Sequence, residues 1–300
     1  MKCGTCSKRW SKPKKDNPNP ILFMKMKMKK TLLIAFLLAI ATNLQAQLDI
    51  KHIPYGENKK QTFDLFLPAK VDKNTPVLIL IHGGAWVMGG NEYTEKHAMD
   101  LRDRGLVVAN VDYRPVSPNV HGKDLIADIA AAVEKVKAAS KDHGFANEGY
   151  HISGISAGAH LALMYSYTTD KPVKSVTAMS APTRLDDPEM LDYARRFNLV
   201  LPVQLLAETT LENKPENLEK LKKISPYAFV KNVPTLVIHG DKDELVPISQ
   251  ARYLYEILQR DKVDSKFIVM EGKGHDVGMN QPDSEKKVLD AIVDWTKSHN

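Results

Sequence analysis

The sequence predicts an α/β fold, in which helices cover both faces of a mostly parallel central sheet. Short apolar runs of the kind found in buried parallel strands recur along the chain, and amphipathic stretches with helical periodicity separate them. A chain that alternates in this way is expected to form a parallel sheet with right-handed crossovers. Residues 47–300 are long enough to bury an ample core as one domain.

The expected elements follow one another in a regular order. Residues 61–67 alternate between apolar and polar side chains, which predicts an antiparallel edge hairpin with residues near 49–54. Buried strands are expected next, at 76–82, 106–112, 149–154, 174–180, 234–239 and 265–270. Amphipathic helices are expected at 93–104, 123–139, 248–261 and 284–298, and a further helix begins at Ala157.

The stretch Gly154-Ile155-Ser156-Ala157-Gly158 is the most informative part of the chain. It places a serine between two glycines, after an apolar run and before a helix rich in small residues. In a nucleophile elbow, a sharp turn between strand and helix holds the serine in a strained backbone conformation and crowds its neighbours. Glycines on both sides relieve that crowding. The pattern predicts a nucleophilic serine, although G-x-S-x-G by itself also occurs by chance.

Three other predicted strands run into loops that carry glycines or ionisable side chains. Each loop supplies one kind of group that a serine nucleophile needs, namely backbone donors, a carboxylate or an imidazole. The loops are His82-Gly83-Gly84-Ala85-Trp86 after the strand at 76–82, Asp241-Lys242-Asp243-Glu244 after the strand at 234–239, and Gly272-Lys273-Gly274-His275 after the strand at 265–270.

Together these four segments resemble the α/β-hydrolase family, and within it the carboxylesterases whose oxyanion loop reads His-Gly-Gly-x-Trp. The resemblance extends from about residue 50 to 298 and includes Asp112-Tyr113-Arg114 after the strand at 106–112. The order serine, acid, histidine along the chain also agrees. The resemblance implies an α/β-hydrolase fold with serine hydrolase activity.

The candidate catalytic residues are Ser156, Asp243 and His275. A serine hydroxyl is a poor nucleophile near neutral pH, so Ser156 needs a base, and His275 is the candidate. A carboxylate would orient the imidazole and stabilise its protonated form. Asp241 and Glu244 compete for this role, but the family pattern places the acid at Asp243. The alternative for Asp241 is a loop carboxylate that accepts hydrogen bonds from nearby backbone amides.

Backbone N–H groups are expected to bind the oxyanion that develops during hydrolysis. Ala157, directly after the serine, is one candidate, and the resemblance implies Gly84 and Ala85 as the others. The sequence departs here from the commoner His-Gly-Gly-Gly form, which weakens the assignment of Ala85. Trp86 would wall the acyl site or serve as core packing.

No cofactor and no metal are expected. The chain has ten histidines, but it contains no His-Glu-x-x-His motif and no zinc-like Cys and His spacing. His82 and His239 each end a predicted strand before a glycine and are expected to bond to loop backbone. His160, four positions after Ser156, is expected to be a helix-packing residue.

One segment, at 184–224, breaks the alternation. It has about forty residues rich in charge and leucine, longer than typical connections. We predict short helices at 188–197 and 216–222 that form a small cap over the active site. The alternative is a peripheral insertion without substrate contact. As pocket-lining candidates we name Leu199, Leu201, Val203, Leu205 and Leu206.

The N-terminal region has the layout of a secretory signal peptide. A basic patch at 24–30 precedes an apolar stretch at 31–42, which is too short for a membrane span of about 20 residues. We expect a signal peptide at 24–46, cleaved after Ala46, and a periplasmic or secreted mature protein without stable membrane insertion. Residues 1–23 are interpreted as a non-native upstream extension, and the Cys3-x-x-Cys6 pair within it is not expected to be a thiol site.

The net positive charge of the chain comes from residues 1–46. Residues 1–46 hold ten of the 42 Lys and Arg residues and one of the 36 acidic residues. The remaining 254 residues carry 32 basic against 35 acidic side chains, a net charge of about −3 rather than +6. Composition therefore gives no support to nucleic-acid binding.

The sequence thus favours a secreted serine esterase that acts on a small-molecule ester. Acetyl or feruloyl esters on plant-type carbohydrate are the expected substrates, on resemblance and localisation alone. Two alternatives remain at this point: an exported amidase or peptidase of the same fold, and a non-catalytic binding protein built on a hydrolase scaffold.

Overall fold

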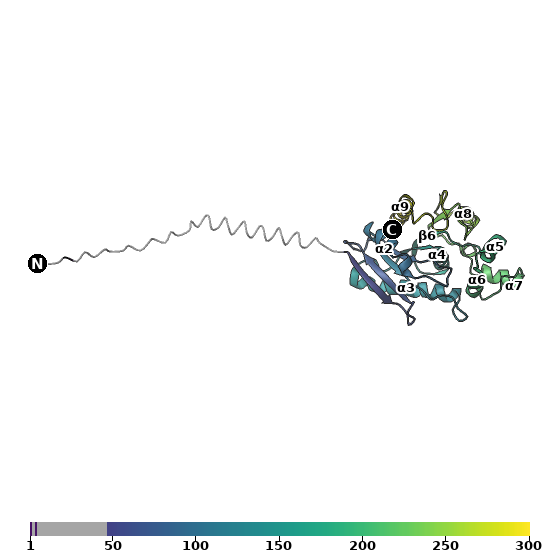
Figure 1. The fold of residues 1–300 in the computed structure, drawn as a ribbon, viewed down its shortest axis with the longest axis horizontal. Coiled ribbons are helices and arrows are strands. Elements are labelled where there is room, and N and C mark those ends of the chain that lie inside the picture. Colours follow the sequence, from purple (N-terminus) through teal and green to yellow (C-terminus); the bar gives the residue numbers. More distant parts are fainter. Residues whose placement is uncertain (2–3, 5–46) are drawn as a thin grey trace. The chain divides into compact units, whose positions relative to one another are not determined.

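The computed structural model describes Met1, Gly4 and residues 47–300 (Figure 1). The upstream extension expected at 1–23 and the signal peptide expected at 24–46 lie outside the described residues, apart from Met1 and Gly4. No helix in the described part of the chain combines the length and the apolar character that a membrane crossing requires.

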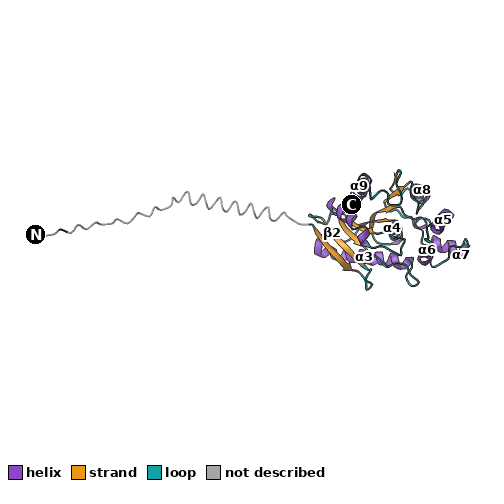
Figure 2. Ribbon diagram, viewed as in Figure 1, coloured by secondary structure: helices purple, strands orange, loops and turns teal. Residues whose placement is uncertain are grey.

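Residues 47–300 build an eight-stranded sheet in the order β1-β2-β4-β3-β5-β6-β7-β8 (Figure 2). β1 and β2 form the antiparallel hairpin expected at the edge, and β2 also pairs antiparallel with β4. All other neighbours pair in parallel. The strands are β1 (Leu48–Pro54), β2 (Thr62–Leu67), β3 (Val77–Ile81), β4 (Val107–Val111), β5 (Tyr150–Ile155), β6 (Val173–Met179), β7 (Thr235–Gly240) and β8 (Ser265–Met270). The predicted α/β fold with its mostly parallel sheet is confirmed.

The helices also lie close to their expected positions. α3 runs past its predicted end at 139 and ends before Gly144, whose φ of 81° suits a glycine cap. The helix expected at 93–104 is divided into a short 3₁₀ turn and α2. The described helices are η1 (Asn91–Tyr93), α2 (Glu95–Asp103), α3 (Gly122–His143), α4 (Ala157–Thr168), α5 (Pro188–Arg196), α6 (Val200–Ala207), α7 (Pro215–Lys222), η2 (Pro226–Phe229), α8 (Ser249–Arg260) and α9 (Pro282–Ser298).

Two hydrophobic layers separate the sheet from its helices. Because successive side chains of a strand point to opposite faces, β3 sends Leu78 and Leu80 into the layer shared with α2 and α9, and Ile79 and Ile81 into the other. The second layer is shared with α3, α4 and α8. In Figure 1, α2 and α9 lie at the upper side of the domain and α3 at the lower side.

The segment at 184–224 folds as three helices, which lie together at one end of the domain in Figure 1. α5 and α7 match the two expected helices. α6 is an additional helix that the sequence analysis did not anticipate. Its eight residues are almost all apolar, so neither a helical nor a strand period stands out in that stretch.

Candidate active site

Ser156 occupies the sharp turn between β5 and α4 and has φ 56° and ψ −122°. The flanking glycines are required by close backbone approaches. A Cβ atom on Gly154 would lie 2.4 Å from the carbonyl carbon of Gly158, and one on Gly158 would lie 2.2 Å from the carbonyl oxygen of Ile81. Any side chain at either position would push the turn away from β3 and α4, so the two glycines allow this strained serine geometry.

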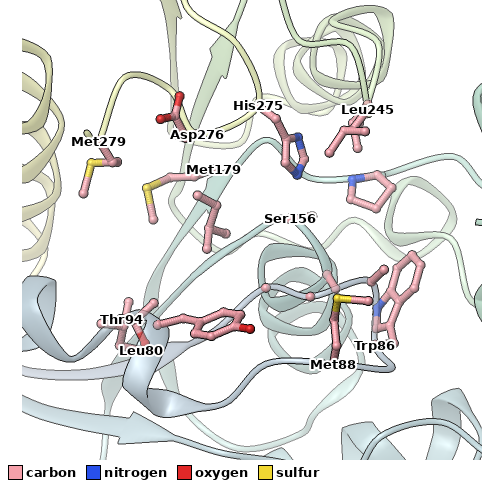
Figure 3. Close-up of a pocket in the computed structure, with 18 of the residues that line it drawn as sticks. Leu80, Trp86, Met88, Thr94, Ser156, Met179, Leu245, His275, Asp276 and Met279 are labelled. Atoms are coloured by element: carbon pink, nitrogen blue, oxygen red, sulfur yellow. The ribbon is translucent and has the colours of Figure 1, made fainter. Parts of the chain in front are cut away.

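His275 and Asp243 come together from the loops that follow β8 and β7. Nδ1 of His275 lies 2.9 Å from Oδ2 and 3.0 Å from Oδ1 of Asp243. The Asp243 carboxylate is buried, and its Oδ1 also accepts hydrogen bonds from the backbone amides of Leu245 and Val246. Since Nδ1 faces the acid, Nε2 is the ring atom that faces away, and Figure 3 shows the ring directed toward the cavity near Ser156.

Asp243 is held in its ionised form. Burial by itself would raise the pKa of Asp243, but hydrogen bonds from His239 and His275 outweigh burial and hold that pKa well below its usual range. Of the three candidate carboxylates, Asp243 is the one in contact with His275. Asp241 accepts a hydrogen bond from the Gly272 amide at 2.6 Å, as expected for a loop carboxylate, and Glu244 is exposed.

Gly84, Ala85 and Ala157 line the same cavity as Ser156 and His275. Ala157 is the first residue of α4, where helix geometry leaves backbone amides without an intrahelical acceptor. Gly84 has φ 116°, and a Cβ atom there would lie 2.0 Å from the carbonyl oxygen of Met88. Ala85 takes a left-handed φ of 49°, a conformation that suits the glycine of the commoner motif.

His82 supports the loop that holds these amides. Its Nδ1 donates to the carbonyl oxygen of Gly83 at 2.6 Å, and its Nε2 lies 3.1 Å from Oδ1 of Asp112. The ring also stacks on Tyr113 with centroids 4.3 Å apart. His82 is thus bonded to loop backbone and to Asp112, both of which fix the turn after β3.

Trp86 lines the cavity, and His160 fixes its indole ring. The indole Nε1 donates to Nδ1 of His160 at 3.2 Å, and Nε2 of His160 lies 2.7 Å from the carbonyl oxygen of Ile224. Burial lowers the pKa of His160 to about 4, so this ring is neutral near pH 7. Trp86 lines the cavity and is also buried in the core, so both of its expected roles coexist.

Two contacts at this site were missed by sequence reasoning. His239 bonds to loop backbone as expected, with Nε2 2.9 Å from the carbonyl oxygen of Val246, but the same atom lies 3.2 Å from Oδ2 of Asp243. Ser180, at the end of β6, donates its hydroxyl to the carbonyl oxygen of His275 at 2.7 Å. The backbone of Ser180 has a left-handed φ of 49°, which is the local sign of its unusual position but cannot be read from the sequence.

The cavity has a volume of about 530 Å³ and is lined mostly by apolar side chains. From the segment at 184–224 it receives Met190, Phe197, Leu199 and Val203. The prediction for three other leucines was wrong: Leu201 is 61% exposed, and Leu205 and Leu206 do not line the cavity. Residues four apart on a helix share a face, so Leu199 and Val203 point the same way and Leu201 and Leu205 point elsewhere. Leu206 lies on the side of Val203 but is buried in the core and does not reach the cavity.

Within residues 47–300 no group of three or more His, Cys, Asp or Glu side chains is arranged to hold a metal ion. The site brings together a serine at an elbow, an imidazole bonded to an ionised carboxylate, and backbone amides around one apolar cavity.

Comparison with known proteins shows the family of the chain. The model of the family described as BD-FAE matches residues 63–258, about two thirds of the chain. The chain belongs to the BD-FAE family. Its resemblance to the α/β-hydrolase esterases is thereby confirmed.

Curated relatives of this BD-FAE family member are named as esterases. The chain is 29% identical over 222 residues to a probable carboxylic ester hydrolase, LipM, of Mycobacterium tuberculosis, covering 69% of this chain and 51% of that protein. It is 24% identical over 257 residues to a probable isoprenylcysteine alpha-carbonyl methylesterase of Oryza sativa subsp. japonica, covering 78% and 59%. The BD-FAE member spans only about half to three fifths of the length of these relatives.

Solved structures share the fold of this BD-FAE family member. A truncated carbohydrate esterase from gut microbiota superposes with a TM-score of 0.70 at 19% identity, covering 85% of this chain and 98% of that chain. Esterase B from Lactobacillus rhamnosis gives a TM-score of 0.69 at 18% identity, covering 93% and 96%. At these identities the likeness shows the fold alone.

Proposed function

We propose that this BD-FAE family protein is a serine esterase that hydrolyses carboxylic esters through an acyl-enzyme on Ser156. The observation that carries the proposal is the 2.9 Å contact between Asp243 and His275 beside a cavity that Ser156 also lines. The names of the curated relatives support the reaction class.

In the first half of the proposed reaction, Nε2 of His275 takes the proton of the Ser156 hydroxyl as Oγ attacks the ester carbonyl carbon. The negative charge that develops on the carbonyl oxygen is bound by the amides of Ala157, Gly84 and Ala85. His275 then gives its proton to the alkoxy oxygen, the ester bond breaks, and the alcohol leaves.

In the second half, water attacks the acyl-enzyme and His275 takes its proton. The carboxylic acid is released when the proton returns to Ser156 Oγ. Asp243 stabilises the imidazolium in both halves, and its depressed pKa keeps it ionised while His275 gains and loses a proton.

For substrates, we propose acyl esters carried by plant-type carbohydrate, with acetyl or feruloyl as the acyl group. A solved carbohydrate esterase shares the fold, which supports the proposal without assigning the substrate. We also propose that the mature protein begins after Ala46 and is periplasmic or secreted, on the basic and apolar patterning of residues 24–46. The proposed partner is a small-molecule ester, and no nucleic acid is involved.

The test is a panel of acetyl, butyryl, octanoyl and feruloyl esters, together with the matching anilides, assayed on the purified protein. Ester hydrolysis that disappears in Ser156→Ala is the expected result. Faster cleavage of the anilides would instead identify an amidase. Mass determination of the exported protein gives the mature N-terminus, and a chain that still carries residues 24–46 would contradict the proposed signal.

A further inference from the structure

The loop that follows β3, at residues 83–89, forms part of the wall of the active-site cavity, and we call it the oxyanion loop. Three consecutive residues in it have positive φ angles, 116° at Gly84, 49° at Ala85 and 61° at Trp86. Such conformations are strained for residues other than glycine and persist only where the surrounding structure enforces them. The shape of the oxyanion loop therefore depends on contacts from outside it.

The two ends of the oxyanion loop meet at His82. A Cβ atom on Gly89 would lie 3.1 Å from the carbonyl oxygen of Gly83 and 3.2 Å from Nδ1 of His82. Within the loop, the amide of Met88 donates to the carbonyl oxygen of Gly84 at 3.0 Å. The orientation of the backbone at Gly84 is thus tied to the way in which the two ends are held together.

Lys60 joins these two ends from the turn between β1 and β2. Its Nζ donates to the carbonyl oxygen of Gly89 at 3.1 Å and to Oδ2 of Asp112 at 3.0 Å. Oδ1 of Asp112 lies 3.1 Å from Nε2 of His82, whose Nδ1 donates to the carbonyl oxygen of Gly83. A continuous series of contacts therefore runs from Gly83 through His82, Asp112 and Lys60 to Gly89.

The groups around Lys60 are themselves fixed by the fold. Nε2 of the neighbouring Gln61 donates to Oδ1 of Asp128 on α3 at 2.8 Å, and the hydroxyl of Tyr55 donates to the carbonyl oxygen of Asp112 at 2.6 Å. The side chain of Lys60 is 33% exposed and that of Asp112 is 8% exposed. Salt screens such a partly buried pair less than a pair on the open surface.

Lys60 also compensates the buried charge of Asp112. Burial by itself would raise the pKa of Asp112, but hydrogen bonds from His82 and Lys60 outweigh burial and hold that pKa below its usual range. Removal of the ammonium group would leave a buried carboxylate with fewer donors, which is unfavourable. The carboxylate would then hold the His82 ring less firmly.

Resting on the proposed esterase function, we propose that Lys60 is a positioning residue for oxyanion binding, which keeps the amides of Gly84 and Ala85 aimed at the developing negative charge. Lys60 does not line the cavity, so it acts through Gly89 and Asp112 and not by contact with substrate. The negative charge is larger in the transition state than in the bound ester. Loss of Lys60 should therefore lower kcat and leave KM nearly unchanged.

The experiment measures kcat and KM for 4-nitrophenyl acetate with the purified protein. Loss of a whole oxyanion donor costs about 10² to 10³ in kcat, and a displaced loop keeps its donors in poorer geometry, so Lys60→Met should lower kcat about tenfold and change KM less than about twofold. Lys60→Arg retains the charge and the donors and should keep kcat within about threefold of the wild-type value. Lys60→Gln lacks the charge and should resemble Lys60→Met, which keeps the test decisive if the methionine variant does not fold.

Lys51→Met is the matched control. Lys51 lies on β1 of the same hairpin, its side chain is 34% exposed, and its Nζ lies 3.1 Å from a carboxylate oxygen of the buried Asp64. Its second carboxylate partner is Glu95 on α2, and it does not line the cavity. The loss of this ion pair should leave kcat within about twofold of the wild-type value.

A trifluoromethyl ketone provides a second measurement. Oγ of Ser156 adds to its carbonyl carbon, the hydroxyl proton passes to His275, and the carbonyl oxygen becomes an oxyanion that the loop amides bind. The inhibition constant should rise about tenfold in Lys60→Met and stay within about twofold of the wild-type value in Lys51→Met.

Four outcomes would overturn the role of Lys60. They are a wild-type kcat in Lys60→Met or Lys60→Gln, an equal loss in Lys60→Met and Lys51→Met, a Lys60→Arg variant as slow as Lys60→Met, and an effect on KM with an unchanged inhibition constant. Each of these leaves the esterase proposal intact. A wild-type protein that hydrolyses no ester and does not react with a fluorophosphonate at Ser156 would overturn the esterase proposal, and the role of Lys60 with it.

Discussion

Nε2 of His239 lies 3.2 Å from Oδ2 of Asp243, the same oxygen that lies 2.9 Å from Nδ1 of His275. His239 is fully buried, and its other ring nitrogen has no hydrogen-bond partner among the described residues. With two backbone amides on Oδ1, the carboxylate is bonded at both oxygens. His239 is thus placed to position Asp243 and to favour its ionised form.

The first prediction concerns this contact. His239→Leu should lower kcat by about tenfold or more, because a hydrogen bond to a charged group is lost. His239→Gln retains an N–H donor and should keep most of the activity. Kinetics across pH 5 to 9 provide the check, since weaker support of Asp243 should alter the pH profile and not only protein yield. Equal activity of the leucine and glutamine variants would show that the contact is structural.

The second prediction concerns the nucleophile. Ser156→Ala should lower kcat by about 10⁴ or more, the scale seen when a triad nucleophile is removed. A fluorophosphonate probe should label the wild-type protein and not the variant, as judged by intact mass. Labelling that persists in Ser156→Ala would place the nucleophile elsewhere.

The third prediction separates two neighbouring carboxylates. Asp243→Asn should lower kcat on the order of 10⁴, because it removes the charge that orients and stabilises the His275 imidazolium. Asp241→Asn is the matched control and should cost less than about tenfold, since Asp241 bonds the Gly272 amide. The reverse ranking would transfer the acid role to Asp241. If neither substitution lowered kcat while Ser156 and His275 remained essential, a more distant carboxylate would have to complete the site.

The fourth prediction is a loss of stability in mild acid. Burial lowers the pKa of both His151 and His160 to about 4, whereas an imidazole in the unfolded chain titrates near 6.5. Between these values the unfolded state binds more protons than the native state, so stability falls as pH decreases through this window. The loss between about pH 7 and 4.5 should be on the order of 2 kcal/mol for each histidine.

Urea unfolding at several pH values measures this loss. His160→Gln keeps a donor for the carbonyl oxygen of Ile224 but does not titrate, so its stability should depend less steeply on pH. The measured range stays above the pH at which Asp243 protonates, because the pKa of that group is depressed. A free energy of unfolding that is equal at pH 7 and 4.5 in the wild-type protein would contradict the prediction.

Much of the fold was predictable because its signals are local. The apolar runs that became β3 to β8 and the amphipathic periods of α2, α3, α8 and α9 each lie within a short window of sequence. The elbow around Ser156 was predictable for a related reason: close packing against β3 and α4 admits only glycine at 154 and 158, so the requirement is visible in the sequence itself.

The errors arose where local sequence has no preferred period. The stretch that forms α6 is apolar on all sides, and its helix was therefore missed. Because that helix was not predicted, the cavity was assigned three further leucines besides Leu199 and Val203, namely Leu201, Leu205 and Leu206. The face that points inward depends on how α6 docks against its neighbours, which a local pattern does not encode.

The sequence by itself determined the class of fold, the order of most of its strands and helices along the chain, and the candidate serine and histidine, while the contact with His275 distinguishes Asp243 from Asp241 and Glu244. Only the tertiary structure decided which groups meet: His239 with Asp243, Ser180 with His275, and Trp86 with His160, 74 residues apart. Ser180 with His275 and Trp86 with His160 join segments that follow different strands, and the crossovers of the parallel sheet set their distances. His239 and Asp243 lie four residues apart and meet through the turn after β7.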